Sequence, residues 1–195
     1  MKVIGVTGGV GAGKSTVLQY LEEAYGAEVI LADQVGHEVM EPGTQAYQEI
    51  LSVFGISVRA GNGRIDRRVL GDLVFGSEQK RRELNAIVHP AVKREILHRI
   101  EQAEVKGTNL VVVEAALFLE EKYDEFCDET WYIYADESRR RSRLRDSRNY
   151  TDERIDQIFR SQKKHEEFLR RCDQVIDNNG TAEDTCCQID KRMKR

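Results

Sequence analysis

Eight consecutive residues near the N-terminus have the spacing of a phosphate-binding loop. Residues 8–15 read Gly-Gly-Val-Gly-Ala-Gly-Lys-Ser, which matches the P-loop pattern G-x-x-x-x-G-K-[ST] at every specified position. Glycines let successive backbone N–H groups point at an anion, and the N-terminus of a following helix adds partial positive charge. Lys14 would reach the β- and γ-phosphates, and Ser15 would bind Mg²⁺. The motif predicts a nucleoside triphosphate with Mg²⁺, and a Gly-rich structural turn is the alternative.

Two acidic residues follow apolar runs and are candidates for the chemistry of phosphoryl transfer. Asp33 comes after residues 28–32, and a carboxylate there could take the proton of an acceptor hydroxyl, an effect worth about 10²–10⁴ in rate. Glu114 follows residues 111–113, where P-loop proteins carry an acid that positions the Mg²⁺ shell, directly or through a water. The structural alternatives are a turn or cap carboxylate for Asp33 and a strand end that meets solvent for Glu114.

A third candidate is a segment dense in arginine. Its members are Arg139, Arg140, Arg141, Arg143, Arg145 and Arg148. On a helix they cannot all face one way, so several are expected to be solvated surface. The functional reading is a lid that closes over a triphosphate, because a positioned arginine is worth about 10³–10⁵ in rate. An RNA-binding patch is the other reading, and the lack of interleaved aromatic residues and of a basic overall balance disfavours it.

The remaining pattern predicts elements that would hold these groups at one edge of a sheet. Short apolar runs indicate five buried strands, over residues 2–7, 28–32, 110–113, 130–134 and 174–176. The order strand, helix, strand at the N-terminus implies parallel strands with a right-handed crossover. Ligands bind at the carboxyl ends of the strands in such sheets. Those ends are expected to carry the P-loop, Asp33, Glu114 and Asn178.

Amphipathic stretches predict the helices and, with them, the domains. Helices are expected from Lys14 to Gly26, after Pro42, after Pro90, over 139–148, and as one long helix carrying Ile155 and Phe168. The fold class is therefore α/β, a five-stranded parallel sheet flanked by helices, with a helical substrate lobe and a helical lid. The expected boundaries are a core of residues 1–56, 107–136 and 172–195, a lobe of 57–106 and a lid of 137–171.

Composition excludes several classes of protein. The chain has 195 residues, of which 40% are hydrophobic and 33% charged, and its net charge is −4, so it is neither disordered nor built to attract a polyanion through its overall field. We expect no nucleic acid, no membrane and no obligate protein partner. The four cysteines form no Cys-x-x-Cys pair with a histidine partner, which favours reduced thiols in a cytoplasmic protein.

With the P-loop, Asp33 and the arginine segment identified, the chain resembles the dephospho-coenzyme A kinase family nearly end to end. Single matches are weak, and their order and spacing together are specific. The matching segments are residues 4–16, 32–33, 41–43, 63–67, 84–85, 89–90, 117–120, 143–144, 147–148, 162 and 175–180. The chain departs from the family pattern at Leu31, where an Asp is common, and at Ala116, where a Pro is common.

The resemblance implies ATP-dependent phosphorylation of the ribose 3′-hydroxyl of dephospho-CoA, with Mg²⁺ as cofactor. It implies that Asp33 is the base, that Lys14 and Thr7 act at the reacting centre, and that Arg148 is a lid contact, for which Arg145 competes. Residues implied in ATP binding are Gly11, Ala12, Gly13, Lys14, Ser15, Thr16, Arg143 and Asn178. Those implied in acceptor binding are Asp33, His89 and Glu120. For His89 a helix-start role ahead of Pro90 is the alternative. For the whole chain the alternatives are another P-loop small-molecule or nucleoside monophosphate kinase and an RNA-associated regulator.

Overall fold

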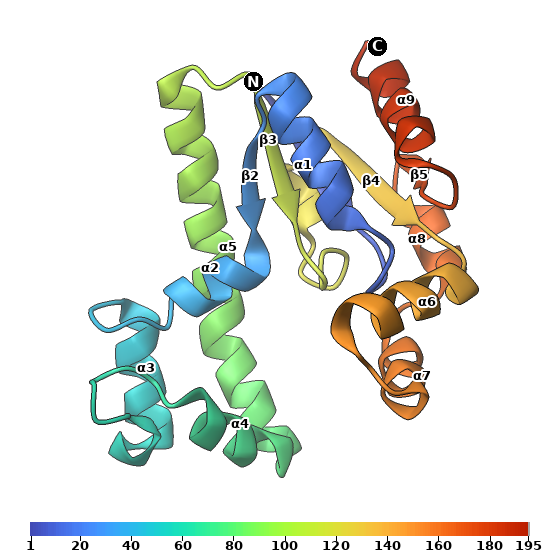
Figure 1. The fold of residues 1–195 in the computed structure, drawn as a ribbon. Helices are drawn as coiled ribbons and strands as arrows, with labels where there is room; N and C mark the ends of the chain where they lie inside the picture. The colour runs from blue at the N-terminus through green and yellow to red at the C-terminus, as the bar shows by residue number, and fades with distance from the viewer. Residues whose placement is uncertain (195) are drawn as a thin grey trace. The chain divides into compact units, whose positions relative to one another are not determined.

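The structure is a computed structural model that describes residues 1–194, and the chain forms two compact units (Figure 1). The first unit contains residues 1–30 and the chain from residue 103 onward, and the second unit contains residues 31–102. The P-loop therefore belongs to the first unit, and Asp33 belongs to the second.

A five-stranded sheet forms the centre of the first unit. The strands are β1 (Lys2–Thr7), β2 (Glu28–Leu31), β3 (Leu110–Glu114), β4 (Glu129–Tyr134) and β5 (Gln174–Asp177), in the order β2-β3-β1-β4-β5. The central strand β1 pairs in parallel with both neighbours, so that Gly5 lies opposite Val113 on one side and Thr130 on the other. The predicted parallel sheet is confirmed. Short apolar runs identified its strands because such a sheet is covered on both faces.

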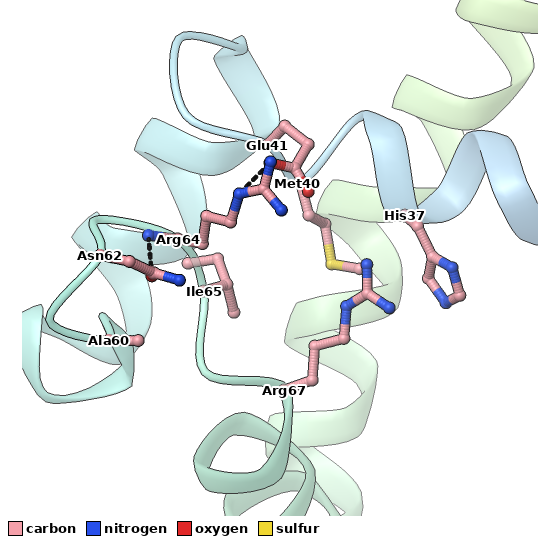
Figure 2. Close-up of a pocket in the computed structure, with 8 residues that line it drawn as sticks. All are labelled: His37, Met40, Glu41, Ala60, Asn62, Arg64, Ile65 and Arg67. Atoms are coloured by element: carbon pink, nitrogen blue, oxygen red, sulfur yellow. Dashed lines mark hydrogen bonds and ion pairs between the residues drawn. The ribbon is translucent and has the colours of Figure 1, made fainter.

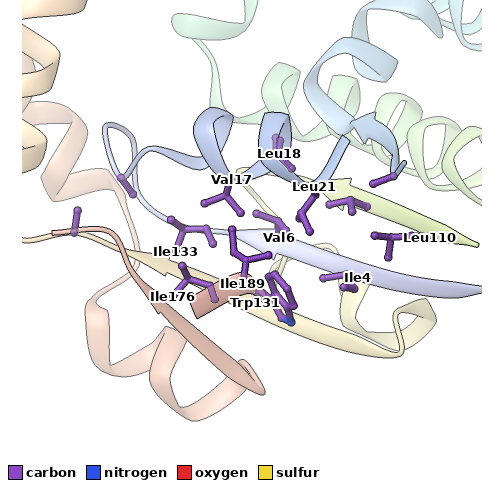
Figure 3. Packing of buried hydrophobic residues seen from close by; sticks show 14 residues of the cluster. Ile4, Val6, Val17, Leu18, Leu21, Leu110, Trp131, Ile133, Ile176 and Ile189 are labelled. Carbon is purple, nitrogen blue, oxygen red and sulfur yellow. The ribbon is translucent and has the colours of Figure 1, made fainter. Parts of the chain in front are cut away.

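Helices α1 (Lys14–Tyr25) and α9 (Ala182–Met193) supply apolar side chains to the main core of this unit (Figure 3). Leu21 of α1 and Ile189 of α9 are fully buried, and so is Trp131 of β4. α9 begins with a capping box in which Thr181 and Asp184 exchange hydrogen bonds, which satisfies two backbone donors. The core therefore holds α1, the helix that begins at the P-loop, against strands β1, β3, β4 and β5.

The segment predicted as a lid, residues 137–171, forms three short helices, α6 (Glu137–Arg148), α7 (Asp152–Ser161) and α8 (His165–Arg171), and the arginine-dense segment lies in α6. The predicted single helix carrying Ile155 and Phe168 is wrong, because the chain is extended at Gln162, with φ −89° and ψ 154°. Ile155 is fully buried, and the ring of Phe168 stacks on Tyr132 with 4.6 Å between centroids. Gln162 interrupts the apolar stripe between Ile155 and Phe168, so α7 and α8 each have a buried contact of their own.

The second unit is helical. Its elements are α2 (Ala32–Glu38), α3 (Gln45–Phe54), the 3₁₀ turn η1 (Ile56–Val58), α4 (Arg67–Phe75) and most of α5 (Glu78–Lys106). A small core of Tyr47, Ile50, Val58, Ile65 and Leu70 holds them together. The hydroxyl oxygen of Thr44 caps α3 and the carboxylate of Asp66 caps α4, as expected for residues of these types at a helix start.

Two sequence predictions for this unit are corrected. The strand predicted over residues 28–32 ends at Leu31, and Asp33, expected directly at the strand end, lies in the first turn of α2. The predicted helix start at Pro90 is wrong, because Pro90 lies inside α5, which is a single helix of 29 residues. An internal proline costs about 3 kcal/mol or more, and apolar residues on both sides offset this: Val88 packs on the small core, and Ile96 is fully buried.

None of the helices within residues 1–194 is long and apolar enough to cross a membrane. Even α5, at 29 residues, is rich in charged side chains.

Candidate functional site

The P-loop has the backbone conformation that a phosphate site needs. Gly11 and Gly13 have φ of 82° and 91°, a region that side chains with a Cβ atom rarely adopt. Helix α1 begins directly after Gly13, and no side chain caps its first turn. The N–H groups at the start of α1 and the helix dipole favour negative charge there, while the N–H of Thr16 already donates to the carbonyl oxygen of Gly13 at 3.2 Å.

Lys14 is held between the loop and the neighbouring strand. Its Nζ atom donates to the carbonyl oxygen of Gly8 at 2.9 Å and lies 3.4 Å from Oε1 of Glu114. Both side chains are largely buried, with 16% and 13% of their surface exposed. Glu114 ends β3, beside the end of β1, where the hydroxyl of the buried Thr7 donates to the carbonyl of Ala115 at 3.3 Å. The ends of β1 and β3 and the start of α1 thus bring an ammonium, a carboxylate and a hydroxyl together.

The opposite side of the loop is fixed by Arg143 and Asn178. Arg143 donates to the carbonyl oxygen of Ala12 at 3.1 Å and to that of Asn178 at 2.9 Å. The Asn178 side-chain amide donates to the same Ala12 carbonyl at 2.7 Å, and its Oδ1 accepts from Thr185 at 2.8 Å. The predicted ATP-binding residues of the first unit therefore form one cluster, which spans residues 11–16, Arg143 and Asn178.

The other arginines of α6 have different surroundings. Arg141 forms ion pairs with Glu137, Asp152 and Asp156, and these acids raise its pKa, Asp156 most strongly. Arg145 pairs with Asp152 at 2.5 Å. Arg148 is exposed, with its guanidinium carbon 6.0 Å from the centre of the Tyr150 ring.

Arg140 contacts the P-loop and was not predicted as a site residue. Its Nε atom donates to the carbonyl oxygen of Val10 at 2.9 Å. The helical spacing carried a signal for it, because Arg140 and Arg143 fall on the same face as Leu144. Leu144 is the buried residue of α6, so this face had to be the one turned inward.

Glu120 lies in the first unit and forms an ion pair with Lys163 at 3.6 Å. Lys163 also contacts Glu167 at 3.1 Å, so Glu120 connects the segment after β3 to the chain between α7 and α8. Its predicted contact with an acceptor remains a prediction.

The predicted acceptor residues Asp33 and His89 belong to the second unit. Asp33 is exposed in the first turn of α2, and His89 is half-buried in the middle of α5. A cavity of about 300 Å³ lies in this unit (Figure 2). It is lined by His37, Met40, Glu41, Ala60, Asn62, Arg64, Ile65 and Arg67. His89 is not among the lining residues, whereas His37 is, one helical turn after Asp33.

The cavity combines cationic, amide and apolar surface. Arg64 pairs with Glu41 through contact of its Nε atom at 3.0 Å, and its backbone N–H donates to Asn62 at 3.1 Å. Figure 2 shows the side chains of Met40 and Ile65 in the same cavity wall, together with Arg67. Sequence reasoning assigned no binding role to this set, because it joins α2 to a loop more than twenty residues later along the chain.

A magnesium ion fits the residues at the P-loop. The hydroxyl of Ser15 and the carboxylate of Glu114 are oxygen donors, which Mg²⁺ prefers, and protein sites for it usually leave the other positions to phosphates and water. In the part of the chain that the structure describes, no group of three or more His, Cys, Asp or Glu side chains could hold a metal. The donors present therefore suit an ion that arrives with a nucleotide.

Comparison with known proteins gives a consistent result. A family profile described as dephospho-CoA kinase matches residues 2–184. The dephospho-CoA kinase of Geobacillus kaustophilus is 39% identical over 186 residues, which cover 95% of this chain and 92% of that protein. Protein TT1252 from Thermus thermophilus has a similar crystal structure, with a TM-score of 0.82, 28% identity and coverage of 99% and 96% of the two chains. Dephospho-CoA kinase from Campylobacter jejuni shares the fold at a TM-score of 0.73 and 24% identity, over 99% and 98% of the chains. The resemblance seen in the sequence is confirmed, and this chain belongs to the dephospho-CoA kinase family.

Proposed function

We propose that this protein transfers the γ-phosphoryl group of ATP to the ribose 3′-hydroxyl of dephospho-CoA, which gives coenzyme A and ADP. The observation that carries the proposal is the P-loop with Lys14 held between Gly8 and Glu114, in a chain that belongs to the kinase family. In the reaction the bond between Pγ and the bridging oxygen of ATP breaks, and a bond from Pγ to the 3′-oxygen forms. The proton of the hydroxyl must leave as that bond forms.

The first unit supplies the ATP-binding residues in this proposal. Backbone N–H groups of residues 11–16 bind the phosphates, and Lys14 neutralises charge that develops on the transferred group. Arg143 and Asn178 hold the loop carbonyl of Ala12, so that the loop keeps its shape when the phosphates bind. Thr7 lies at the adjoining strand end, where its buried hydroxyl is tied to Ala115.

Ser15 and Glu114 would hold Mg²⁺, which supplies charge neutralisation between the β- and γ-phosphates when it is bound. The carboxylate of Glu114 also fixes the ammonium group of Lys14 at 3.4 Å. This contact keeps Lys14 directed towards the loop before ATP binds.

The second unit supplies the acceptor site. Asp33 is the base that takes the 3′-hydroxyl proton, and its exposed position in α2 leaves it accessible to a substrate. The nearby cavity suits the rest of dephospho-CoA, because Arg64, Arg67 and His37 can face a diphosphate while Met40 and Ile65 contact an apolar arm. His89 of this unit and Glu120 of the first unit are the remaining proposed acceptor residues. Arg148, or Arg145 in its place, is the proposed lid cation.

An acceptor panel tests the proposal. Purified protein with ATP and Mg²⁺ is assayed for ADP release with dephospho-CoA, AMP, UMP or shikimate as acceptor, and the product is identified by mass. Release that depends on dephospho-CoA, with phosphate on the 3′-oxygen, supports the assignment. Turnover of another acceptor in its place would assign a different P-loop kinase, and nucleotide binding without any acceptor would favour a regulator. A cytoplasmic location is part of the proposal, in keeping with four free cysteines.

A further inference from the structure

Arg140 connects three segments of the first unit. Its Nε atom donates to the carbonyl oxygen of Val10 in the P-loop at 2.9 Å. A terminal nitrogen of the same guanidinium donates to Oε1 of Gln162, at the end of α7. The guanidinium carbon lies 4.3 Å from the centre of the Phe159 ring, within the range of a cation–π contact. One side chain of α6 thus holds the P-loop and α7 at once.

The P-loop is shaped to admit this guanidinium. A Cβ atom on Gly9 would lie 2.4 Å from Nη2 of Arg140, and one on Gly11 would lie 2.9 Å from the Arg140 carbonyl oxygen. Both distances are shorter than real contacts, so the two glycines give α6 room to approach the loop. Gly9 is one of the unspecified positions of the P-loop motif. A side chain at this position would have to displace the guanidinium of Arg140.

The charge of Arg140 is balanced only in part, by the electrostatic attraction of Glu137. Among residues 1–194 no carboxylate forms an ion pair with it, in contrast to Arg141 in the next position, which has three. Burial lowers the pKa of Arg140. A guanidinium remains charged in proteins, so a largely desolvated cation lies against the loop that binds phosphates. Such a charge is costly without an anion nearby, and a bound triphosphate would supply one.

We propose that Arg140 is a positioning residue that couples phosphate binding in the P-loop to the placement of α6 and α7. Phosphate charge near the loop strengthens the attraction between the loop and Arg140. Because the same guanidinium holds Gln162 and Phe159, the stronger attraction also orders α7. Arg143 differs from it, since its hydrogen bonds go to Ala12 and Asn178 and include no residue of α7. The inference rests on ATP as the ligand of the P-loop, and it does not depend on the identity of the acceptor.

Hydrogen exchange with a non-hydrolysable ATP analogue tests the coupling directly. In the unaltered protein the analogue should slow amide exchange both in residues 8–16 and in α7. In Arg140→Gln the protection of residues 8–16 should persist, whereas the protection of α7 should be lost. Arg139→Gln is the matched control, since it removes the same charge from an exposed position next to Arg140. This control should behave like the unaltered protein.

A kinetic cycle with Gln162 provides the second measurement. Loss of a hydrogen bond to a charged group predicts about a tenfold rise in the KM for ATP in Arg140→Gln, with a smaller change in kcat. Gln162→Ala should reproduce most of the effect, and the double variant should add less than about twofold to it, because both changes break the same link. Arg140→Lys keeps the charge without the guanidinium fork, so it should restore only part of the affinity.

The outcomes separate coupling from a structural role. If Arg140→Gln lowers only the melting temperature while exchange in α7 still responds to the analogue, the proposal is overturned. It is also overturned if α7 in the unaltered protein does not respond, or if the two substitutions have additive effects. If Arg140→Gln does not fold, Gln162→Ala alone decides by the same exchange measurement. The exchange measurements need no acceptor, so failure of the acceptor assignment would leave them interpretable, whereas the kinetic cycle requires an acceptor that is turned over.

Discussion

The ammonium group of Lys14 lies 3.4 Å from the carboxylate of Glu114, and both side chains are largely withdrawn from solvent. A P-loop lysine thus has an anionic partner on the neighbouring strand of the same unit. In the proposed function Lys14 would face the phosphates of ATP, and Glu114 would be one of the groups that hold Mg²⁺. The Lys14–Glu114 pair therefore places the cation proposed to face the phosphates next to the carboxylate proposed to act on the metal ion.

Glu114→Gln tests this connection. The substitution keeps the shape of the side chain and removes the charge that would orient the Mg²⁺ shell. We expect the Mg²⁺ concentration for half-maximal activity to rise about 10- to 100-fold, with a smaller change in the KM for ATP. The measurement is a Mg²⁺ titration of initial rate at saturating ATP. Glu129→Gln, which breaks only the ion pair with Lys2 at 2.7 Å, is the control. An unchanged Mg²⁺ dependence in Glu114→Gln would remove Glu114 from the metal site.

Asp33→Asn tests the base. The amide is close in shape to the carboxylate and cannot accept the hydroxyl proton, so kcat should fall by about 10² or more. ATP binding should be retained, since the P-loop belongs to the first unit and Asp33 to the second. Steady-state rates and calorimetric ATP binding check the two parts. Asp72→Asn, at an exposed position of α4, controls for loss of a charge from the second unit. Undiminished turnover in Asp33→Asn would contradict the proposed mechanism.

The sheet could be predicted from sequence because its signals are local. Each strand is a short apolar run, such as residues 110–113, and four of the five predicted runs are followed directly by a glycine or a charged residue. The helix that begins after Gly13 and ends at Gly26 could also be predicted, because glycine is common where the backbone is left-handed at a helix end. Both glycines have left-handed backbone in the structure. Predictions failed where two local signals disagreed. Pro90 is a strong helix-start signal, and the apolar residues on both sides of it, packed in the second unit, override that signal.

The site was predictable only in part, for a related reason. The P-loop is one continuous segment, and its spacing alone indicates phosphate. The contact of Arg140 with Val10 joins residues 130 positions apart, and no local pattern contains that distance. The same holds for the cavity in the second unit, where His37 and Arg67 come from different elements. Such contacts depend on how the elements pack. The burial of Leu144 turns one face of α6 inward, and the burial of Ile65 in the small core positions the loop that lines the cavity.

Gly5 provides a test of packing in the first unit. It lies in the central strand, and a Cβ atom there would lie 2.0 Å from Cζ of Phe118, which is fully buried. We expect Gly5→Ala to lower the free energy of unfolding by about 1–3 kcal/mol or more, because a buried ring must move. Urea denaturation measures the change. Gly71→Ala in α4 is the control: nothing lies within 4 Å of its Cβ position, and alanine favours the helix by about 0.5–1 kcal/mol. If the double variant Gly5→Ala with Phe118→Leu regains part of the lost free energy of unfolding, the ring of Phe118 is the cause of the loss. Equal stability of Gly5→Ala and the unaltered protein would contradict this packing.

The two tyrosines that share Asp190 predict an alkaline transition. The hydroxyls of Tyr20 and Tyr25 donate to Oδ1 of Asp190 at 2.8 and 2.7 Å, which ties α1 to α9. The hydrogen bonds to Asp190 are the main cause that raises the pKa of both tyrosines from 10.0 to about 12. A folded-state pKa above the unfolded value stabilises the folded protein below pH 10, and this contribution is lost as the pH rises from about 10 to 12.

The same hydrogen bonds lower the pKa of Asp190, Tyr25 being the larger cause and Tyr20 the next. The stabilisation from Asp190 is therefore present above the ordinary range of an aspartate and is lost when the pH falls through its lowered folded value. Spectroscopic titration of phenolate should show Tyr20 and Tyr25 ionising near pH 12 in the folded protein, and Asp190→Asn should bring both towards 10. Tyr20→Phe with Tyr25→Phe should remove two phenolates from the step near pH 12, to which the buried Tyr132 also contributes, and should reduce the loss of stability between pH 10 and 12. If as many phenolates still ionise near pH 12 in Asp190→Asn as in the unaltered protein, the shared carboxylate is not what raises the pKa of Tyr20 and Tyr25.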